Sequence, residues 1–168
     1  MGRTGITTAQ REWLISIAQA ALAAEHVWPN MAGCEAALES SYGQSALARQ
    51  DNNLFGMKQH VHPVAGTVIL PTHEVLSGVD VMVKAAFVKY ATIAECFEDR
   101  METLLRLAPH YPHYAAALTA TDSAVYIQEV SKSWSTDPTR ASKVLAIYGE
   151  AFPYGNTEAV NDVMAGEN

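Results

Sequence analysis

The chain has 168 residues, a length that suits one domain burying roughly two thirds of its unfolded surface. Its composition, 49% hydrophobic and 17% charged, is typical of a globular protein and excludes a collagen-like, coiled-coil or disordered chain. The net charge is −7, from 18 acidic and 11 basic residues without a basic cluster, which argues against a nucleic-acid-binding protein.

Residues 7–25 predict a first helix, because Thr7 followed by Gln10 is a capping-box pattern ahead of a stretch with one apolar face. Pro29 is expected to end that segment. Asn30 is then expected to cap a second helix, which places its apolar side chains inward.

Glu39 lies near the end of this second helix, just before a glycine stop at Gly43 and one more predicted helical turn over residues 45–49. A carboxyl at the end of a buried helix can have a raised pKa, as a general acid requires. Periodicity alone fits an ordinary surface glutamate at least as well. Glu35 lies one turn earlier on the same side of the helix.

A small exposed β-hairpin is predicted in the middle of this otherwise helical chain. Residues 67–70 and 79–83 are β-branched runs, and Ser77-Gly78 between them suits a turn. Pro63 and Pro71 fit only an edge strand or the end of a strand.

Helical periodicity returns after the hairpin. Thr92 and Glu95 form a second capping-box pattern, for a helix that runs to about Leu107. Its inward stripe is predicted to contain Ile93, Phe97, Met101, Leu104 and Leu105. Residues 109–114 are expected to form a loop.

Two further helices are predicted near the end of the chain. One starts at Asp122 or Ser123, and the last has Asp137 as N-cap and Pro138 as its first residue. Cys34 and Cys96 fall in helical patterns and are expected to be small buried thiols rather than a disulfide.

Several segments, in order along the chain, resemble the signature of family 73 glycoside hydrolases, the N-acetylglucosaminidases of bacterial peptidoglycan. The resemblance covers about residues 7–150, and its motifs are residues 37–45 (ALESSYGQS), 52–58 (NNLFGMK), 72–74 (THE), 87–92 (FVKYAT) and 134–138 (WSTDP).

The resemblance implies a mainly α, lysozyme-like fold: a single domain over residues 1–153, with a β-hairpin lobe over about 58–90. The Gly, Asn and Glu content after Pro153 predicts a flexible tail over 154–168. It implies hydrolysis of the β-1,4 bond between N-acetylglucosamine and N-acetylmuramic acid in peptidoglycan, with glycan strands as the partner and no cofactor. Glu39 then matches the general acid, and Glu74 the second carboxylate.

A glycan cleft would need flat aromatic faces and hydrogen-bonding side chains. The predicted substrate-binding residues are Tyr42, Gln44, Asn53, Phe55, Tyr90 and Trp134, with Tyr111 and Tyr114 as further aromatic candidates. Trp134 stands where the family usually has a tyrosine, so this chain keeps an aromatic ring and an N–H donor there but has no phenol hydroxyl. The spacing of the histidines His60, His62, His73, His110 and His113 matches no metal-ligand motif, so no metal is expected.

Two alternatives stay open: a lytic transglycosylase, and a non-catalytic glycan-binding or assembly module. No stretch approaches the roughly 20 apolar residues of a membrane span, and no signal peptide is seen. The interpretation is a protein made in the cytoplasm that acts in the periplasm or cell wall, by lysis or dedicated secretion. A phage lysin, a secreted effector with a cognate immunity protein and a fragment of an autolysin all fit it.

Overall fold

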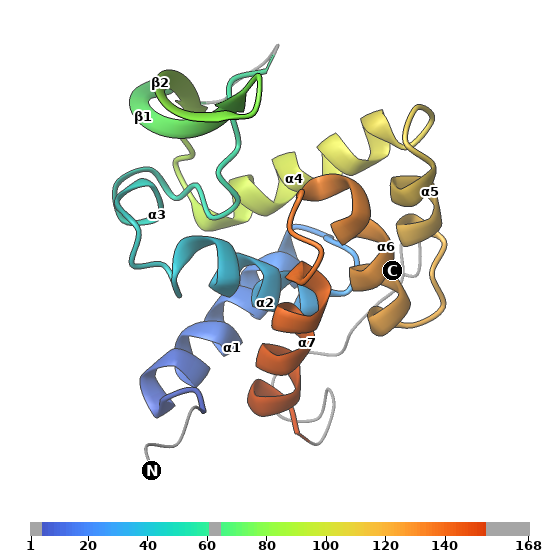
Figure 1. Ribbon diagram of the computed structural model, residues 1–168. Helices are drawn as coiled ribbons and strands as arrows, with labels where there is room; N and C mark the ends of the chain where they lie inside the picture. Colours follow the sequence, from blue (N-terminus) through green and yellow to red (C-terminus); the bar gives the residue numbers. More distant parts are fainter. Residues whose placement is uncertain (1–4, 61–64, 154–168) are drawn as a thin grey trace.

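Seven helices and one two-stranded hairpin make up the described part of the chain, residues 5–60 and 65–153 of a computed structural model (Figure 1). In chain order they are α1 (Thr8–Ala23), α2 (Pro29–Ser40), α3 (Ala46–Asp51), β1 (Thr67–Leu76), β2 (Val79–Val88), α4 (Ile93–Leu107), α5 (Pro112–Leu118), α6 (Ser123–Trp134) and α7 (Arg140–Ala151). The predicted mainly helical fold with a small hairpin is therefore confirmed. No helix in these two ranges has the length and hydrophobicity needed to span a bilayer.

The first predicted capping box is present and starts α1. Gln10 N donates to Thr7 Oγ1 at 3.1 Å, and Thr7 N donates to Gln10 Oε1 at 2.8 Å. At α4 only half of the predicted pattern forms. Thr92 Oγ1 accepts from Glu95 N, whereas the Glu95 carboxylate accepts from Ala91 N instead of the capping residue.

The start of α2 differs from the prediction. Pro29 is its first residue rather than the end of the preceding segment, because the fixed φ of proline suits the first helical position. Asn30 therefore lies inside the helix, where it is fully buried, and does not cap it. The capping residue is Trp28, which has a left-handed φ of 48° and makes no side-chain capping bond.

The segment predicted as a loop over residues 109–114 contains the start of a helix. Pro112 begins α5, again by supplying a fixed φ at the first position. The last helix starts later than predicted, because Asp137 accepts from the N–H and the hydroxyl of Thr139 at 2.8 and 2.7 Å. These bonds form a turn, and α7 begins only at Arg140.

The hairpin is longer than the β-branched runs indicated. Its register runs from Thr67 opposite Val88 to Leu76 opposite Val79, and both turn residues, Ser77 and Gly78, have positive φ. Such a turn matches the right-handed twist of a hairpin. Pro71 fits within β1 because each strand of a two-stranded sheet has an open edge. Pro63 lies outside the described residues.

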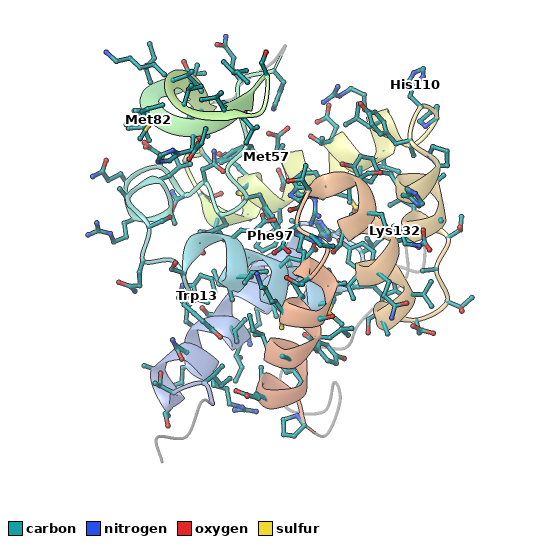
Figure 2. The ribbon with its side chains drawn as sticks, in the orientation of Figure 1. Trp13, Met57, Met82, Phe97, His110 and Lys132 are labelled. Carbon is teal, nitrogen blue, oxygen red and sulfur yellow. The ribbon has the colours of Figure 1, made fainter. Side chains whose placement is uncertain are left out.

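The core is organised around α2, which is buried along most of its length and packs against α1 and α7 (Figure 1). Phe97 lies in the middle of the helical body, whereas Met82 lies on the hairpin (Figure 2). Cys34 and Cys96 are free and buried, as predicted. Leu105 is 55% exposed, so the predicted inward stripe of α4 is wrong at that position.

Gly43 provides a test of the chain reversal after α2. Its φ is +76°, and a Cβ there would lie 2.7 Å from Trp13 Nε1. Gly43→Ala is expected to lower the free energy of unfolding by about 1–3 kcal/mol, measured by urea denaturation. Gly149→Ala in α7 is the matched control, since no atom lies within 4 Å of its added Cβ, and it should be neutral or stabilising. Equal effects of the two substitutions would contradict this account of Gly43.

Candidate active site

Glu39 is fixed in place by the abrupt end of α2. Ser41, Tyr42 and Gly43 all have left-handed φ values, of 53°, 56° and 76°. Ser40 Oγ donates to Ala36 O at 2.6 Å and accepts from Gly43 N at 2.9 Å, so the side chain of Ser40 joins the last turn of the helix to the reversal. The helix therefore ends one residue after Glu39, and the chain leaves it at Ser41.

The two oxygens of the Glu39 carboxyl group have different surroundings. Oε1 accepts from Arg140 Nε at 3.1 Å and from Arg140 Nη2 at 2.7 Å. Oε2 is buried and has no hydrogen-bond partner within the described residues. Burial raises the pKa of Glu39 above its ordinary value, and the charge of Arg140 opposes that rise only in part. Oε2 is therefore the oxygen at which a proton on this carboxyl would not compete with a bond from Arg140.

Glu35, one turn earlier, has the opposite electrostatic character. It is fully buried, and its carboxylate accepts from Arg100 Nη1 and Nη2 at 2.9 and 2.8 Å, from Arg140 Nη2 at 2.9 Å and from the Tyr126 hydroxyl at 2.8 Å. Burial would raise the pKa of Glu35, but the two arginines outweigh it and lower the pKa to about 2. Glu35 therefore stays ionised and is poorly suited to donate a proton.

Arg100 connects the predicted aromatic residues to this buried ion pair. Its guanidinium carbon lies 4.6 Å from the centre of the Phe55 ring and 4.2 Å from that of Trp134. The two rings also meet edge to face, with centres 6.2 Å apart. Cation–π contacts of this kind stabilise a buried guanidinium. The structure thus brings Phe55 and Trp134 together, but with faces turned to Arg100.

Sequence reasoning missed three residues of this network: Arg100, Tyr126 and Arg140. The periodicity contained a signal for Arg100, because it lies between Phe97 and Leu104 on the buried side of α4. A charged residue in such a position needs a buried partner of opposite charge.

Asn53 and Tyr90 use their polar atoms inside the protein. The Asn53 side-chain amide donates to Met57 O and Val88 O at 3.0 and 2.9 Å, and its oxygen accepts from Met57 N at 3.0 Å. The buried Tyr90 hydroxyl donates to Asp99, and burial raises its pKa. The Asn53 bonds hold the segment after α3 against the end of β2, and the Tyr90 bond holds the segment after β2 against α4. Direct sugar contact by either residue stays a prediction, one that this geometry does not favour.

The remaining predicted binding residues lie at two places. Tyr42 and Gln44 are on the turn directly after Glu39, where Gln44 is exposed and Tyr42 meets Trp13 edge to face at 6.1 Å. Trp134 lines a surface pocket of about 770 Å³ between the end of α6 and the start of α7. Hydroxyl groups suited to a polar ligand line the same pocket, from Ser131, Ser133, Ser135 and Thr136.

Glu74 lies on β1, in the hairpin at one end of the molecule (Figure 1). Its carboxylate forms an ion pair with Lys58, and its side chain is 36% exposed. Among the described residues, no hydrogen bond or ion pair joins Glu74 to Glu39. Within these residues no group of three or more His, Cys, Asp or Glu side chains is arranged to bind a metal ion.

Solved structures show which class of protein this fold defines. The catalytic domain of the autolysin Auto from Listeria monocytogenes superposes with a TM-score of 0.74 at 24% identity, over 89% of this chain and 88% of that one. A glycoside hydrolase domain of FlgJ from Salmonella typhimurium gives a TM-score of 0.65 at 27% identity, over 87% of this chain and 99% of that one. The fold is therefore the expected lysozyme-like fold of glycoside hydrolases.

Sequence comparisons give the family. The family model described as mannosyl-glycoprotein endo-beta-N-acetylglucosaminidase matches residues 15–151, and the chain belongs to this glucosaminidase family. Exo-glucosaminidase LytG from Bacillus subtilis is 33% identical over 140 residues, which are 81% of this chain and 48% of that protein. Peptidoglycan hydrolase FlgJ from Salmonella typhimurium is 32% identical over 117 residues, 67% of this chain and 36% of that protein. The chain thus spans about half or less of the length of these curated relatives.

Proposed function

We propose that this protein is a peptidoglycan hydrolase that cleaves the β-1,4 bond between N-acetylglucosamine and N-acetylmuramic acid, with Glu39 as general acid. The observation that carries the proposal is the surroundings of Glu39, a carboxyl at the end of a buried helix. One of its oxygens is held by Arg140, and the other has no donor among residues 5–60 and 65–153. The names of the relatives, a glucosaminidase and a peptidoglycan hydrolase, support the substrate class.

In the proposed reaction Glu39 gives the proton on Oε2 to the glycosidic oxygen. The bond between that oxygen and the anomeric carbon breaks, and its electron pair stays with the departing oxygen. Because Oε2 is buried, Glu39 must change its side-chain torsions, or a covering group must move, before the proton reaches a bound sugar. A water molecule finally supplies the hydroxyl group at the anomeric carbon, and its second proton passes to a carboxylate: to Glu74 in an inverting displacement, or back to Glu39 in a substrate-assisted reaction.

Glu74 is the proposed second carboxylate, and two mechanisms fit it. Glu74 activates the attacking water in an inverting displacement, or it supports attack by the N-acetyl group of the substrate. The position of Glu74 on a hairpin, away from the helix that carries Glu39, suits either mechanism. It gives the enzyme two carboxyls on separate parts of the fold.

Glu74→Gln is expected to lower kcat about 100-fold, because glutamine cannot accept a proton from water. The rate is measured as release of reducing ends from purified cell walls. Asp80→Asn, on β2 of the same hairpin, is the matched control and should keep at least about half of the activity, since Asp80 is exposed and pairs only with His73 among the described residues. A loss below about threefold in Glu74→Gln would rule out its role as base.

Product analysis tests the function itself. Peptidoglycan digested by the protein, reduced with borohydride and analysed by mass spectrometry should contain new reduced N-acetylglucosamine ends. New 1,6-anhydro-muramic ends would instead identify a lytic transglycosylase, and binding to cell walls without new ends would identify a non-catalytic module. Either result would overturn the proposal.

The proposed place of action is the cell wall, reached from the cytoplasm by lysis or by dedicated secretion, with glycan strands as partner. A cognate immunity protein stays a prediction for the case in which the protein is a secreted effector.

A further inference from the structure

Arg140 is the structural link between the proposed general acid and the buried ion pair beneath it. It is 2% exposed and begins α7. Its Nη2 group donates to Glu39 Oε1 and also to Glu35 Oε1, at 2.7 and 2.9 Å. Its Nε group donates to Glu39, and its Nη1 group donates to Ser131 Oγ at 2.8 Å. One guanidinium group is therefore shared by two carboxyls with different pKa values.

The two carboxyls depend on Arg140 to different degrees. Glu35 is also held by Arg100 and by the Tyr126 hydroxyl. Among the described residues the Glu39 carboxyl group accepts hydrogen bonds only from Arg140. Whatever changes the position of Arg140 should therefore act on Glu39 more than on Glu35.

We propose that Arg140 is a positioning residue that orients Glu39 and stabilises its carboxylate after the proton has moved to the glycosidic oxygen. Glu35 limits this stabilisation, because it shares the same guanidinium group. The inference rests on the proposed role of Glu39 as the acid. A carboxylate formed at a partly buried position is costly unless a preorganised donor faces it, and Arg140 supplies that donor before the reaction begins. Sharing with Glu35 keeps Arg140 from holding Glu39 permanently ionised.

The charged groups around Glu39 all fit this arrangement. Glu35 lies on the same helix, Arg100 comes from α4 and Arg140 from α7, whereas Tyr126 from α6 is neutral and bonds to Glu35. Burial and Glu35 raise the pKa of Glu39, while Arg140 and Arg100 lower it. Weakening the contact with Arg140 should thus raise the pKa of Glu39 further and make it a weaker acid.

Arg140→Lys tests the proposal while keeping the positive charge. Lysine has a single ammonium group and cannot reproduce the forked contacts with Glu39, Glu35 and Ser131. We expect kcat to fall about 10- to 100-fold with KM changed less than about threefold. The high-pH limb of the kcat profile should move to higher pH by roughly one unit, because Glu39 holds its proton more tightly.

Two further variants keep the test decisive if Arg140→Lys does not fold. Ser131→Ala removes only the acceptor of Arg140 Nη1, and it should move the same limb in the same direction by a smaller amount. Lys143 also lies on α7, and among the described residues its charge is paired only with Asp137. Lys143→Gln should therefore leave the high-pH limb unchanged. The proposal would be overturned if the high-pH limb of folded Arg140→Lys stayed at the wild-type position. If Arg140→Lys does not fold, an unshifted limb in Ser131→Ala has the same meaning. An equal shift in Lys143→Gln would also overturn it.

These outcomes are separable from failure of the proposed function. If Glu39→Gln keeps full activity, Glu39 is not the acid and both proposals fail. If Glu39→Gln is inactive while the limb of Arg140→Lys stays at the wild-type position, only the role of Arg140 is contradicted.

Discussion

Glu39→Gln is expected to lower kcat on purified cell walls by about 10²–10⁴-fold, the usual contribution of a general acid. Glutamine has nearly the same size as glutamate and can still accept hydrogen bonds from Arg140 through Oε1. It cannot donate an acidic proton to the glycosidic oxygen. The initial rate of turbidity loss gives kcat, and the thermal unfolding midpoint of the variant should stay close to that of the wild type.

The pH dependence of the activity is an independent test of Glu39 as the general acid. Because burial raises the pKa of Glu39, the acid stays protonated to a higher pH than an exposed glutamate. Activity of the wild type should therefore fall as pH rises through this raised pKa, and the residual activity of Glu39→Gln should lack that limb. A variant with wild-type rate and an unchanged pH profile would show that another group is the acid.

Glu35→Gln is expected to have the largest effect on stability, a loss of about 3–5 kcal/mol in the free energy of unfolding. The substitution leaves Arg100 and Arg140 buried with one negative charge fewer between them. A buried charge without its partner is far more costly than a pair removed together. Urea denaturation at neutral pH measures the loss, which is a large fraction of the stability of a small domain.

Acid unfolding should confirm the charge state of Glu35. Its pKa in the folded protein is about 2, below the ordinary value of 4.5. The ionised carboxylate thus contributes stability at neutral pH, and this contribution is lost as pH falls from about 4.5 to about 2. The variant should lack this part of the acid transition.

Glu129→Gln is the matched control for Glu35→Gln. Glu129 lies on α6, where its carboxylate pairs with His113 and Lys132 near the surface. Loss of such pairs should cost no more than about 1 kcal/mol. Equal destabilisation by the two substitutions would contradict the structural role assigned to Glu35.

Local signals in the sequence were enough to predict most of the fold. The capping box of Thr7 and Gln10 and the turn at Ser77-Gly78 depend on neighbouring residues alone, and both predictions are confirmed. Errors occurred where two local signals compete. Proline both ends one segment and starts the next, so Pro29 was assigned to the wrong side of a helix boundary.

The candidate site was harder to predict because its charges meet only in three dimensions. Glu39 was identified from the family resemblance of the motifs over residues 37–45 and 52–58, because its place at the end of a helix fitted an ordinary surface glutamate at least as well. Arg140 lies 101 residues further along the chain. The contacts of Phe55 with Arg100 and of Tyr90 with Asp99 are likewise tertiary. Sequence therefore predicted Phe55 and Trp134, which lie against Arg100, but it did not predict the residues that hold the charges of the site: Arg100, Tyr126 and Arg140.

The most direct measurement of the central claim is a side-by-side product analysis of wild type and Glu39→Gln on the same purified peptidoglycan. New reducing N-acetylglucosamine ends, identified by mass spectrometry after borohydride reduction, should accumulate with time for the wild type and stay at the level of untreated peptidoglycan for Glu39→Gln. Equal accumulation in both digests, or wild-type products that end in 1,6-anhydro-muramic acid, would contradict the account.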